Sequence, residues 1–141
     1  MTGEGKVLAY KLVTTGVLLV GFGLDVASLF WSMEEIGQVV FTPLGESILS
    51  LWFLAAFILG VISFRHVHHA NLPSRVFHAV IIFYMLALTL MHGVNNLLLN
   101  NLGWYLKTFS GPVYPYVAGA VLLAMIAFTA TRRAKPEPMA A

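Results

Sequence analysis

The sequence predicts an all-α fold: a bundle of four transmembrane helices with both termini in the cytoplasm. Two observations predict it. The 141 residues are 59% hydrophobic and 10% charged, whereas an ordinary soluble domain has about 25% charged residues. In addition, Lys and Arg gather on one side of the apolar segments. A chain of this length is expected to form a single domain.

The apolar residues fall into four runs, each long enough for a helix to cross about 30 Å of hydrocarbon at about 1.5 Å per residue. Lipid offers no hydrogen-bond partners to the backbone, so each run is expected to be helical. A buried soluble helix explains one such run but not four, because too few residues remain to cover them. The predicted helices span roughly residues 12–31, 48–64, 76–99 and 113–130.

The flanking charges predict the orientation of the bundle. Seven of the eight cations precede the first helix, lie between the second and third, or follow the fourth: Lys6, Lys11, Arg65, Arg75, Arg132, Arg133 and Lys135. The segment between the first and second helices has three glutamates and no cation. By the positive-inside rule both termini are cytoplasmic, and we expect a bacterial or archaeal cytoplasmic membrane.

The remaining composition excludes several classes of site. Cysteine is absent, so disulfides and thiolate ligands are excluded. The cations are spread along one side as topology requires, so we expect lipid and not nucleic acid as their partner. The first apolar run is expected to be a retained helix and not a cleaved signal. We expect a transmembrane domain over 1–133 and a disordered tail over 134–141.

Asp25 and His92 are the candidate catalytic residues. Ionisable groups inside a membrane are a functional hypothesis by default, and these two lie about one turn beyond the midpoints of the first and third predicted helices. They therefore share a depth in the outer half, where Asn95 and Asn96 extend the polar patch. A carboxylate and an imidazole suit proton exchange with a quinol, or metal binding. The alternative is an ion pair or hydrogen bond that only joins the two helices.

The third predicted helix also carries His78, fourteen residues before His92. Fourteen steps of about 100° return to within about 40° of the starting face and rise about 21 Å. This spacing resembles that of haem-bearing helices in b-type cytochromes, so both residues are candidate ligands of haem b. His66 or His69 would complete a haem at His78. His92 would need a ligand from a partner chain.

The run His66-Val67-His68-His69 is interpreted as a basic interfacial loop, and no metal site is predicted there. Imidazoles at this position are expected to contact lipid headgroups. Incidental zinc or copper binding is the alternative.

The layout resembles that of the DoxX/DoxD-like small four-helix membrane proteins, some of which are linked to thiosulfate or other quinone-coupled redox chemistry. The residues that carry the resemblance are Gly23-Leu24-Asp25, Pro43-Leu44-Gly45-Glu46, His92 and Arg132-Arg133. The resemblance implies cytoplasmic termini and places Glu46 and Asp25 near a shared site on the outer side. The many histidines and the Asn95-Asn96 pair depart from that pattern.

Three hypotheses for function follow. The first is an integral membrane subunit of a quinone-linked electron-transfer complex, with or without haem b, so that the chain is at most one subunit of a membrane oxidoreductase. The second is a non-catalytic accessory or assembly subunit of a larger membrane complex. The third is a small homo-oligomeric transporter. The first two require other membrane subunits as partners.

Overall fold

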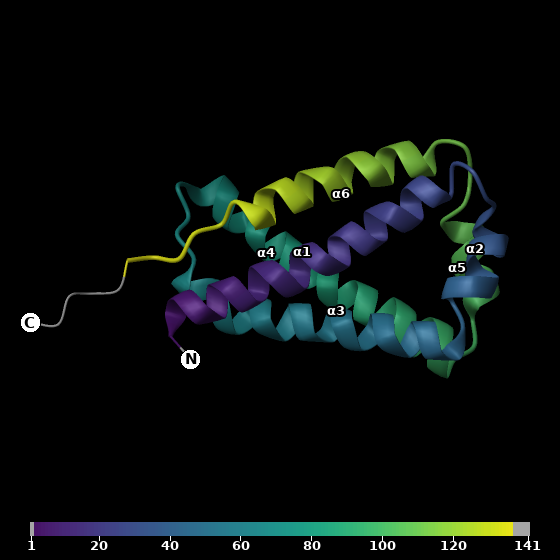
Figure 1. The fold of residues 1–141 in the computed structure, drawn as a ribbon, viewed down its shortest axis with the longest axis horizontal. Coiled ribbons are helices and arrows are strands. Elements are labelled where there is room, and N and C mark those ends of the chain that lie inside the picture. The colour runs from purple at the N-terminus through teal and green to yellow at the C-terminus, as the bar shows by residue number, and fades with distance from the viewer. Residues whose placement is uncertain (1, 137–141) are drawn as a thin grey trace, which may run out of the picture.

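The computed structural model describes residues 2–136, and these are predominantly helical. Four long helical rods run side by side and alternate in direction (Figure 1). They are α1 (Gly3–Ala27), α3 (Pro43–Ser63), α4 (Leu72–Thr89) with its π-helical continuation η2 (Leu90–Leu98), and α6 (Tyr114–Ala130). The short helices are α2 (Met33–Val40), the 3₁₀ turn η1 (Phe64–His66) and α5 (Leu102–Thr108).

Three of the rods have the length and composition of membrane spans. These are Gly3–Ala27, Pro43–His66 and Leu72–Leu98, and α6 is a shorter apolar helix of 17 residues. The prediction of an all-helical chain with membrane-type helices is thereby confirmed. Large apolar side chains are exposed along the rods, among them Leu12, Leu51 and Phe83, each at least 63% exposed. Such a surface is compatible with lipid contact.

Three of the four long helices, α1, α3 and α4, begin earlier than the apolar runs predict, because polar caps start them. α1 begins at Gly3 and not near residue 12, with the Thr2 hydroxyl accepting from the Gly5 amide at 3.1 Å. α3 begins at Pro43, with Thr42 as its N-cap and proline in its first turn. Hydrophobicity locates the part of a helix that lies in lipid, whereas capping residues locate its first turn.

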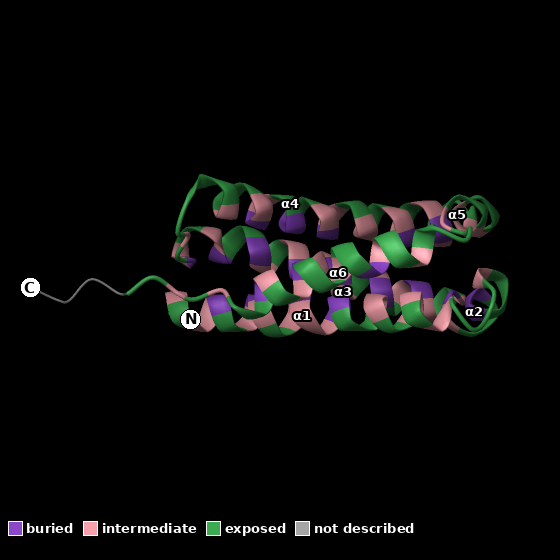
Figure 2. Cartoon of the chain, turned by 90° about the horizontal axis from the view of Figure 1, so that it is seen from above, coloured by how far each residue is buried: buried purple, intermediate pink, exposed green. Residues whose placement is uncertain are grey.

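The bundle closes through contacts of α1 with α3 and α6, and of α3 with α4 and η2. The buried side chains lie between the rods and the exposed ones face outward (Figure 2). Close approach depends on glycine at one contact in particular: a Cβ on Gly60 would lie 2.7 Å from Ile82 and 3.2 Å from Tyr10. The rods are therefore closely packed in this half of the bundle.

The two ends of the bundle differ. Both ends of the described chain lie beside the α3–α4 connection, and α2 and α5 contact each other at the opposite end (Figure 1). Ala134 forms an isolated bridge with Val67, and the Lys135 amide donates to the His66 carbonyl at 2.8 Å. The first residues of the predicted disordered tail, 134–136, are thus held by backbone bonds. The remainder of that tail lies outside the described residues.

Candidate functional site

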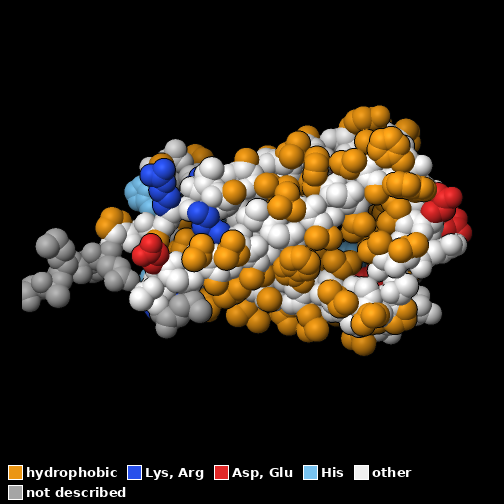
Figure 3. All heavy atoms as spheres, in the orientation of Figure 1, with side chains coloured by type: hydrophobic (Ala, Val, Ile, Leu, Met, Phe, Trp, Pro, Cys, Tyr) orange, Lys and Arg blue, Asp and Glu red, His pale blue; other side chains and the backbone are white. Residues whose placement is uncertain are grey.

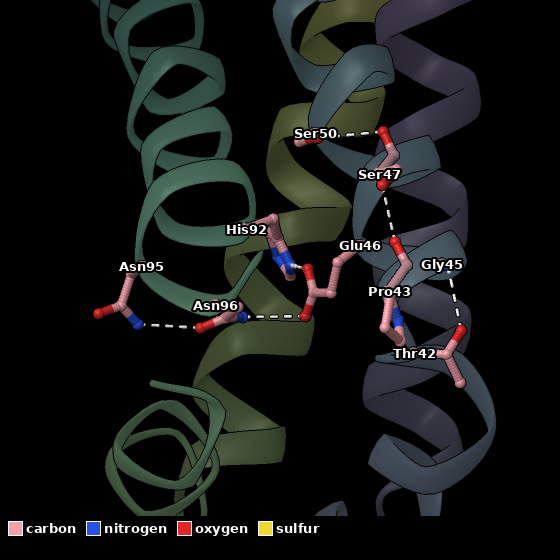
Figure 4. A network of polar contacts seen from close by, with 9 residues as sticks. All are labelled: Thr42, Pro43, Gly45, Glu46, Ser47, Ser50, His92, Asn95 and Asn96. Atoms are coloured by element: carbon pink, nitrogen blue, oxygen red, sulfur yellow. Dashed lines mark hydrogen bonds and ion pairs between the residues drawn. The ribbon is translucent and has the colours of Figure 1, made fainter. Parts of the chain in front are cut away.

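A buried carboxylate joins α3 to η2 near the end that carries α2 and α5. Glu46 lies in the first turn of α3 and is 2% exposed. One carboxylate oxygen, Oε2, is 2.5 Å from His92 Nδ1, and the other, Oε1, accepts from Asn96 Nδ2 at 2.9 Å (Figure 4). Both Glu46 oxygens are therefore paired with groups on η2.

The π-helical geometry of η2 presents these two partners together. His92 and Asn96 are four residues apart, which is close to one turn when the backbone bonds run from i to i+5. Gly93 lies between them, and a Cβ there would be 3.3 Å from the Ser50 Cβ. The absence of a side chain at Gly93 thus lets η2 approach α3. The amide of Asn95 extends the network by donating to Asn96 Oδ1 at 2.9 Å.

Three aromatic rings hold the His92 imidazole in place. Phe53 stacks on it with ring centroids 5.2 Å apart, and Phe41 and Tyr105 approach at 5.8 and 5.3 Å. Burial raises the pKa of the Tyr105 hydroxyl, with a further contribution from the nearby Tyr114 and Glu46, so the hydroxyl stays protonated at neutral pH. The imidazole is 3% exposed and has little freedom to rotate.

The bond to Glu46 sets the tautomer of His92. A carboxylate accepts hydrogen bonds, so Nδ1 carries the proton and donates it. The other ring nitrogen, Nε2, makes no hydrogen bond with the residues that the structure describes. In the neutral ring Nε2 is an acceptor, and the Glu46 carboxylate stabilises the ring if Nε2 takes up a proton. The arrangement suits a proton acceptor aimed at a ligand.

Beside His92 lies a cavity of about 390 Å³ in the middle of the bundle. Its lining comes from α1, α3, α4, η2 and α6 and from the short helices α2 and α5. Apolar side chains make up most of the lining. The polar ones are Asp25, Tyr84, His92, Tyr105 and Tyr114. A mostly apolar cavity with a few polar groups is typical of small-molecule sites, and this volume lies toward the lower end of their range of about 300–1,000 Å³.

The cavity opens on the apolar flank of the bundle. Its lining includes Val20 on α1 and Val117 and Val121 on α6, which are 37%, 57% and 46% exposed. The space-filling view has a hollow between α1 and α3, toward the end with α2 and α5, with histidine and acidic atoms visible at its floor (Figure 3). A ligand can therefore reach the cavity from the side without passing between α2 and α5.

The sequence-predicted pair, Asp25 and His92, lines this one cavity but forms no direct bond. The Asp25 carboxylate is partly buried and lies against α6, where Oδ2 would be 2.9 Å from a Cβ on Gly119. It makes no hydrogen bond or ion pair with the residues that the structure describes. His92 instead pairs with Glu46, which does not line the cavity, so within the described part of the chain Asp25 is the one carboxylate in the lining.

Glu46 is the residue that the polar pattern alone did not single out. The predicted second helix begins near residue 48 and leaves Glu46 in the outer loop, and only the family resemblance implied a role for it. The pair Thr42-Pro43 is a helix-start signal that would have extended α3 to include Glu46. The shared outer-side site implied for Glu46 and Asp25 stays a prediction; Glu46 bonds to His92, and Asp25 lines the same cavity as His92.

The second group of histidines lies at the end of the bundle that carries the termini. His78 is fully buried, and its Nδ1 is 2.8 Å from Nε2 of His69. Burial lowers the pKa of His69, and the positive charges of Arg132 and Arg75 lower it further. A ring that is neutral at pH 7 supports the direct bond between the two imidazoles. His66 lies in η1 and accepts from Arg65 Nε at 3.3 Å.

This contact does not fit a haem iron bound between His69 and His78. Two axial imidazoles at about 2 Å from a metal stand about 4 Å apart across it, which is wider than the observed 2.8 Å. For His92, Nε2 is the nitrogen left for a ligand, and the carboxylate behind it is a usual partner of a metal-bound imidazole. A haem that uses His92 and a partner chain stays a prediction.

Beside His78 several buried polar atoms lack a partner. His78 Nε2 and the hydroxyls of Tyr10, Thr14 and Thr129 make no hydrogen bond within the part of the chain that the structure describes. The Tyr10 ring lies 5.1 Å from the His78 ring, and its hydroxyl lies near both threonines. Groups of this kind usually bind internal water.

Comparison with protein-family models, curated proteins and solved structures found no match to this chain. The resemblance to DoxX/DoxD-like proteins therefore stays a prediction. The interpretation of function depends on the geometry of the chain itself.

Proposed function

We propose that α1, α3, α4 with η2, and α6 all span a membrane, with both termini on the cytoplasmic side. Support comes from the alternating direction of the four rods (Figure 1) and from the seven cations at the end with the termini. α6 has 17 residues, at the short end of the range of about 17–25 for a spanning helix.

Thiol labelling tests this orientation, because the chain has no native cysteine. Ala70→Cys lies in the exposed α3–α4 connection and Ser110→Cys lies in the exposed segment before α6. In intact cells an impermeant maleimide should label Ser110→Cys only. Labelling of Ala70→Cys alone would reverse the orientation, and labelling of both would remove α4 with η2 as a span, because that rod lies between the two positions.

For function, we infer that the chain is a membrane subunit of a quinone-linked electron-transfer complex and that its own part is to bind quinol. The observation that carries this proposal is the buried Glu46–His92 pair, whose histidine lines an apolar cavity of about 390 Å³. A quinol head is an apolar ring with two hydroxyls. The cavity supplies apolar walls for the ring and polar groups for the oxygens.

The chemistry assigned to the chain is proton transfer. Oxidation of a quinol releases two protons and two electrons. His92 Nε2 accepts one proton from a quinol hydroxyl, and Glu46 stabilises the imidazolium through Nδ1. Asp25, on the other side of the cavity, is the candidate acceptor of the second proton. The electrons pass to a redox centre, such as a haem or iron–sulfur cluster, that a partner subunit supplies.

Binding of a short-chain quinone tests the proposal without the partner. The purified protein should quench its tyrosine and tryptophan fluorescence on titration with decylubiquinone, because three tyrosines line the cavity. His92→Ala should weaken binding at least about tenfold, which is one lost hydrogen bond to a charged or strongly polar group.

The matched control is His68→Gln, which changes an exposed histidine at the other end. It should bind as the unmodified protein does. No saturable quenching by the unmodified protein, or equal binding by His92→Ala, would contradict the proposed function.

A second candidate is the accessory subunit. Apolar side chains remain well exposed at the end with α2, including Phe30 at 75%, Trp31 at 59% and Val39 at 79%. They provide a surface for a partner subunit as well as for the membrane interface. If quinone does not bind and Val39→Asp abolishes co-purification of other membrane subunits, this candidate becomes the better account.

A further inference from the structure

A second cavity lies at the end of the bundle with the termini, outside the site described above. It has a volume of about 570 Å³ and lies between the first turns of α1 and the segment that follows α6. Its lining includes the apolar side chains of Val7 and Leu8 and five charged side chains. The charged ones are the cations Lys11, Arg132, Arg133 and Lys135 and the carboxylate of Glu4. We name this cavity the basic cleft.

The cations of the basic cleft divide into one that is engaged and three that are available. Arg132 is fixed, because its Nε donates to the Phe128 carbonyl at 2.9 Å and its Nη1 to Ser74 Oγ at 3.0 Å. Its guanidinium also lies 3.7 Å from the centre of the Phe128 ring. The side chains of Lys11, Arg133 and Lys135 make no ion pair with the residues that the structure describes.

The charge balance of the basic cleft calls for an anion. Four positive side chains face one carboxylate, and the three available cations come from two segments more than 120 positions apart in the sequence. Folding has to bring these like charges together at the end of the bundle. A bound anion would relieve the repulsion that their proximity creates.

We propose that the basic cleft binds the phosphate headgroup of an anionic phospholipid. The inference rests on the proposed membrane placement, which puts this end of the bundle at the headgroups of the cytoplasmic leaflet, where basic pockets between helices bind such lipids. Leu8 and Leu12 on α1 are 54% and 67% exposed beside Lys11, and they give the acyl chains an apolar surface.

The chemistry favours a phospholipid over free phosphate. A phosphodiester headgroup carries one negative charge and is joined to apolar chains, so it uses both the cations and the exposed leucines. Inorganic phosphate has no chains to contact the leucines, so it uses only the cations of the cleft. The cleft and the leucines therefore form one amphipathic site.

Lipid retention in detergent tests the proposal on the full chain. Native mass spectrometry should detect one phosphatidylglycerol retained in preference to phosphatidylcholine of the same acyl chains. The double variant Lys11→Gln/Arg133→Gln should retain about 30-fold less phosphatidylglycerol, since each cation near the surface contributes about fivefold. The charge-conserving variant Lys11→Arg/Arg133→Lys should retain it.

The control removes the same net charge from elsewhere. Arg65→Gln/Lys107→Gln changes two exposed cations that do not line the cleft and should keep the preference. Equal retention of both lipids by the unmodified protein overturns the proposal, as does equal loss in the control variant. Full displacement of the lipid by millimolar inorganic phosphate would assign the cleft to free phosphate instead. Because quinone binding is measured separately at the opposite end, either proposal can fail alone.

Discussion

The contribution of Glu46 to stability provides the sharpest prediction. Glu46→Ala removes the acceptor of two buried hydrogen bonds and leaves the His92 N–H and the Asn96 amide without partners. An unsatisfied buried donor costs about 1–3 kcal/mol, which gives about 2–6 kcal/mol for the two. Polar contacts in membrane proteins average nearer 0.6 kcal/mol each, so we expect a loss of about 2–4 kcal/mol.

The assay is reversible unfolding in mixed micelles, followed by circular dichroism as the fraction of denaturing detergent rises. Glu46→Gln serves as the matched variant, because it keeps the size and one acceptor for Asn96 while its amide can donate to His92. It should lose less than about 1 kcal/mol. It should nevertheless weaken quinone binding, since donation to Nδ1 moves the ring proton to Nε2 and removes the acceptor there.

A double-mutant cycle isolates the pair. Glu46→Ala and His92→Ala each lower the free energy of unfolding, and the sum of the two decreases should exceed the decrease for the double variant by at least about 1 kcal/mol. The reason is that each single variant already removes the Glu46–His92 contact, which the double variant loses only once. Additive losses, or a loss below about 0.5 kcal/mol for Glu46→Ala, would refute the interpretation of Glu46–His92 as a structural and functional unit.

Three further predictions follow from the geometry. Gly119→Ala should displace the Asp25 carboxylate, which would lie 2.9 Å from the new Cβ, and weaken quinone binding several-fold; Gly23→Ala has nothing within 4 Å and should leave binding unchanged. Tyr10→Phe removes a buried hydroxyl without a partner and should raise the free energy of unfolding by up to about 1–3 kcal/mol; a loss instead would show that water satisfies the hydroxyl. Burial and neighbouring cations lower the pKa of His69 below its usual value of about 6.5, so the unfolded chain binds the proton more readily than the folded chain. The free energy of unfolding should therefore be highest above about pH 6.5 and decrease as the pH falls below that value. Unfolding curves of His69→Gln should lose part of this pH dependence, and those of the exposed His68→Gln should keep it.

The helical class of the fold could be predicted because, in lipid, each long apolar run can satisfy its own backbone hydrogen bonds only as a helix. The starts of three long helices were predicted too late, because caps at Thr2, Thr42 and Asn71 are polar and lie outside the apolar runs. The end of α1 also differs: the helix stops at Ala27, four residues before the predicted end. Cap chemistry carries the information that hydropathy lacks at these boundaries.

For the site, the sequence indicated Asp25 and His92 at one depth, with Asn96 extending the polar patch. The structure places His92 and Asp25 at one cavity and Asn96 on the Glu46 network. The sequence did not indicate which carboxylate pairs with His92. Depth alone matched His92 with Asp25, whereas the pairing depends on the lateral arrangement of the rods and on the π-helical turn at η2, neither of which a regular spacing of about 100° per residue predicts. The sequence placed His66 or His69 close to His78, and the path of the α3–α4 connection brings His69 into direct contact with it.

The side opening of the central cavity changes how its occupancy has to be measured. Val20, Val117 and Val121 line the cavity and are partly exposed, so under the proposed membrane placement a ligand that enters from the side arrives from the hydrocarbon phase and not from water. The concentration of ligand that matters for binding is then its mole fraction in the lipid or detergent. A hydrophobic tail on the ligand raises this mole fraction, because the ligand partitions from water into the lipid or detergent. Half-saturation should therefore follow the ratio of quinone to detergent when both are diluted together, and bulk molarity alone will understate or overstate the affinity.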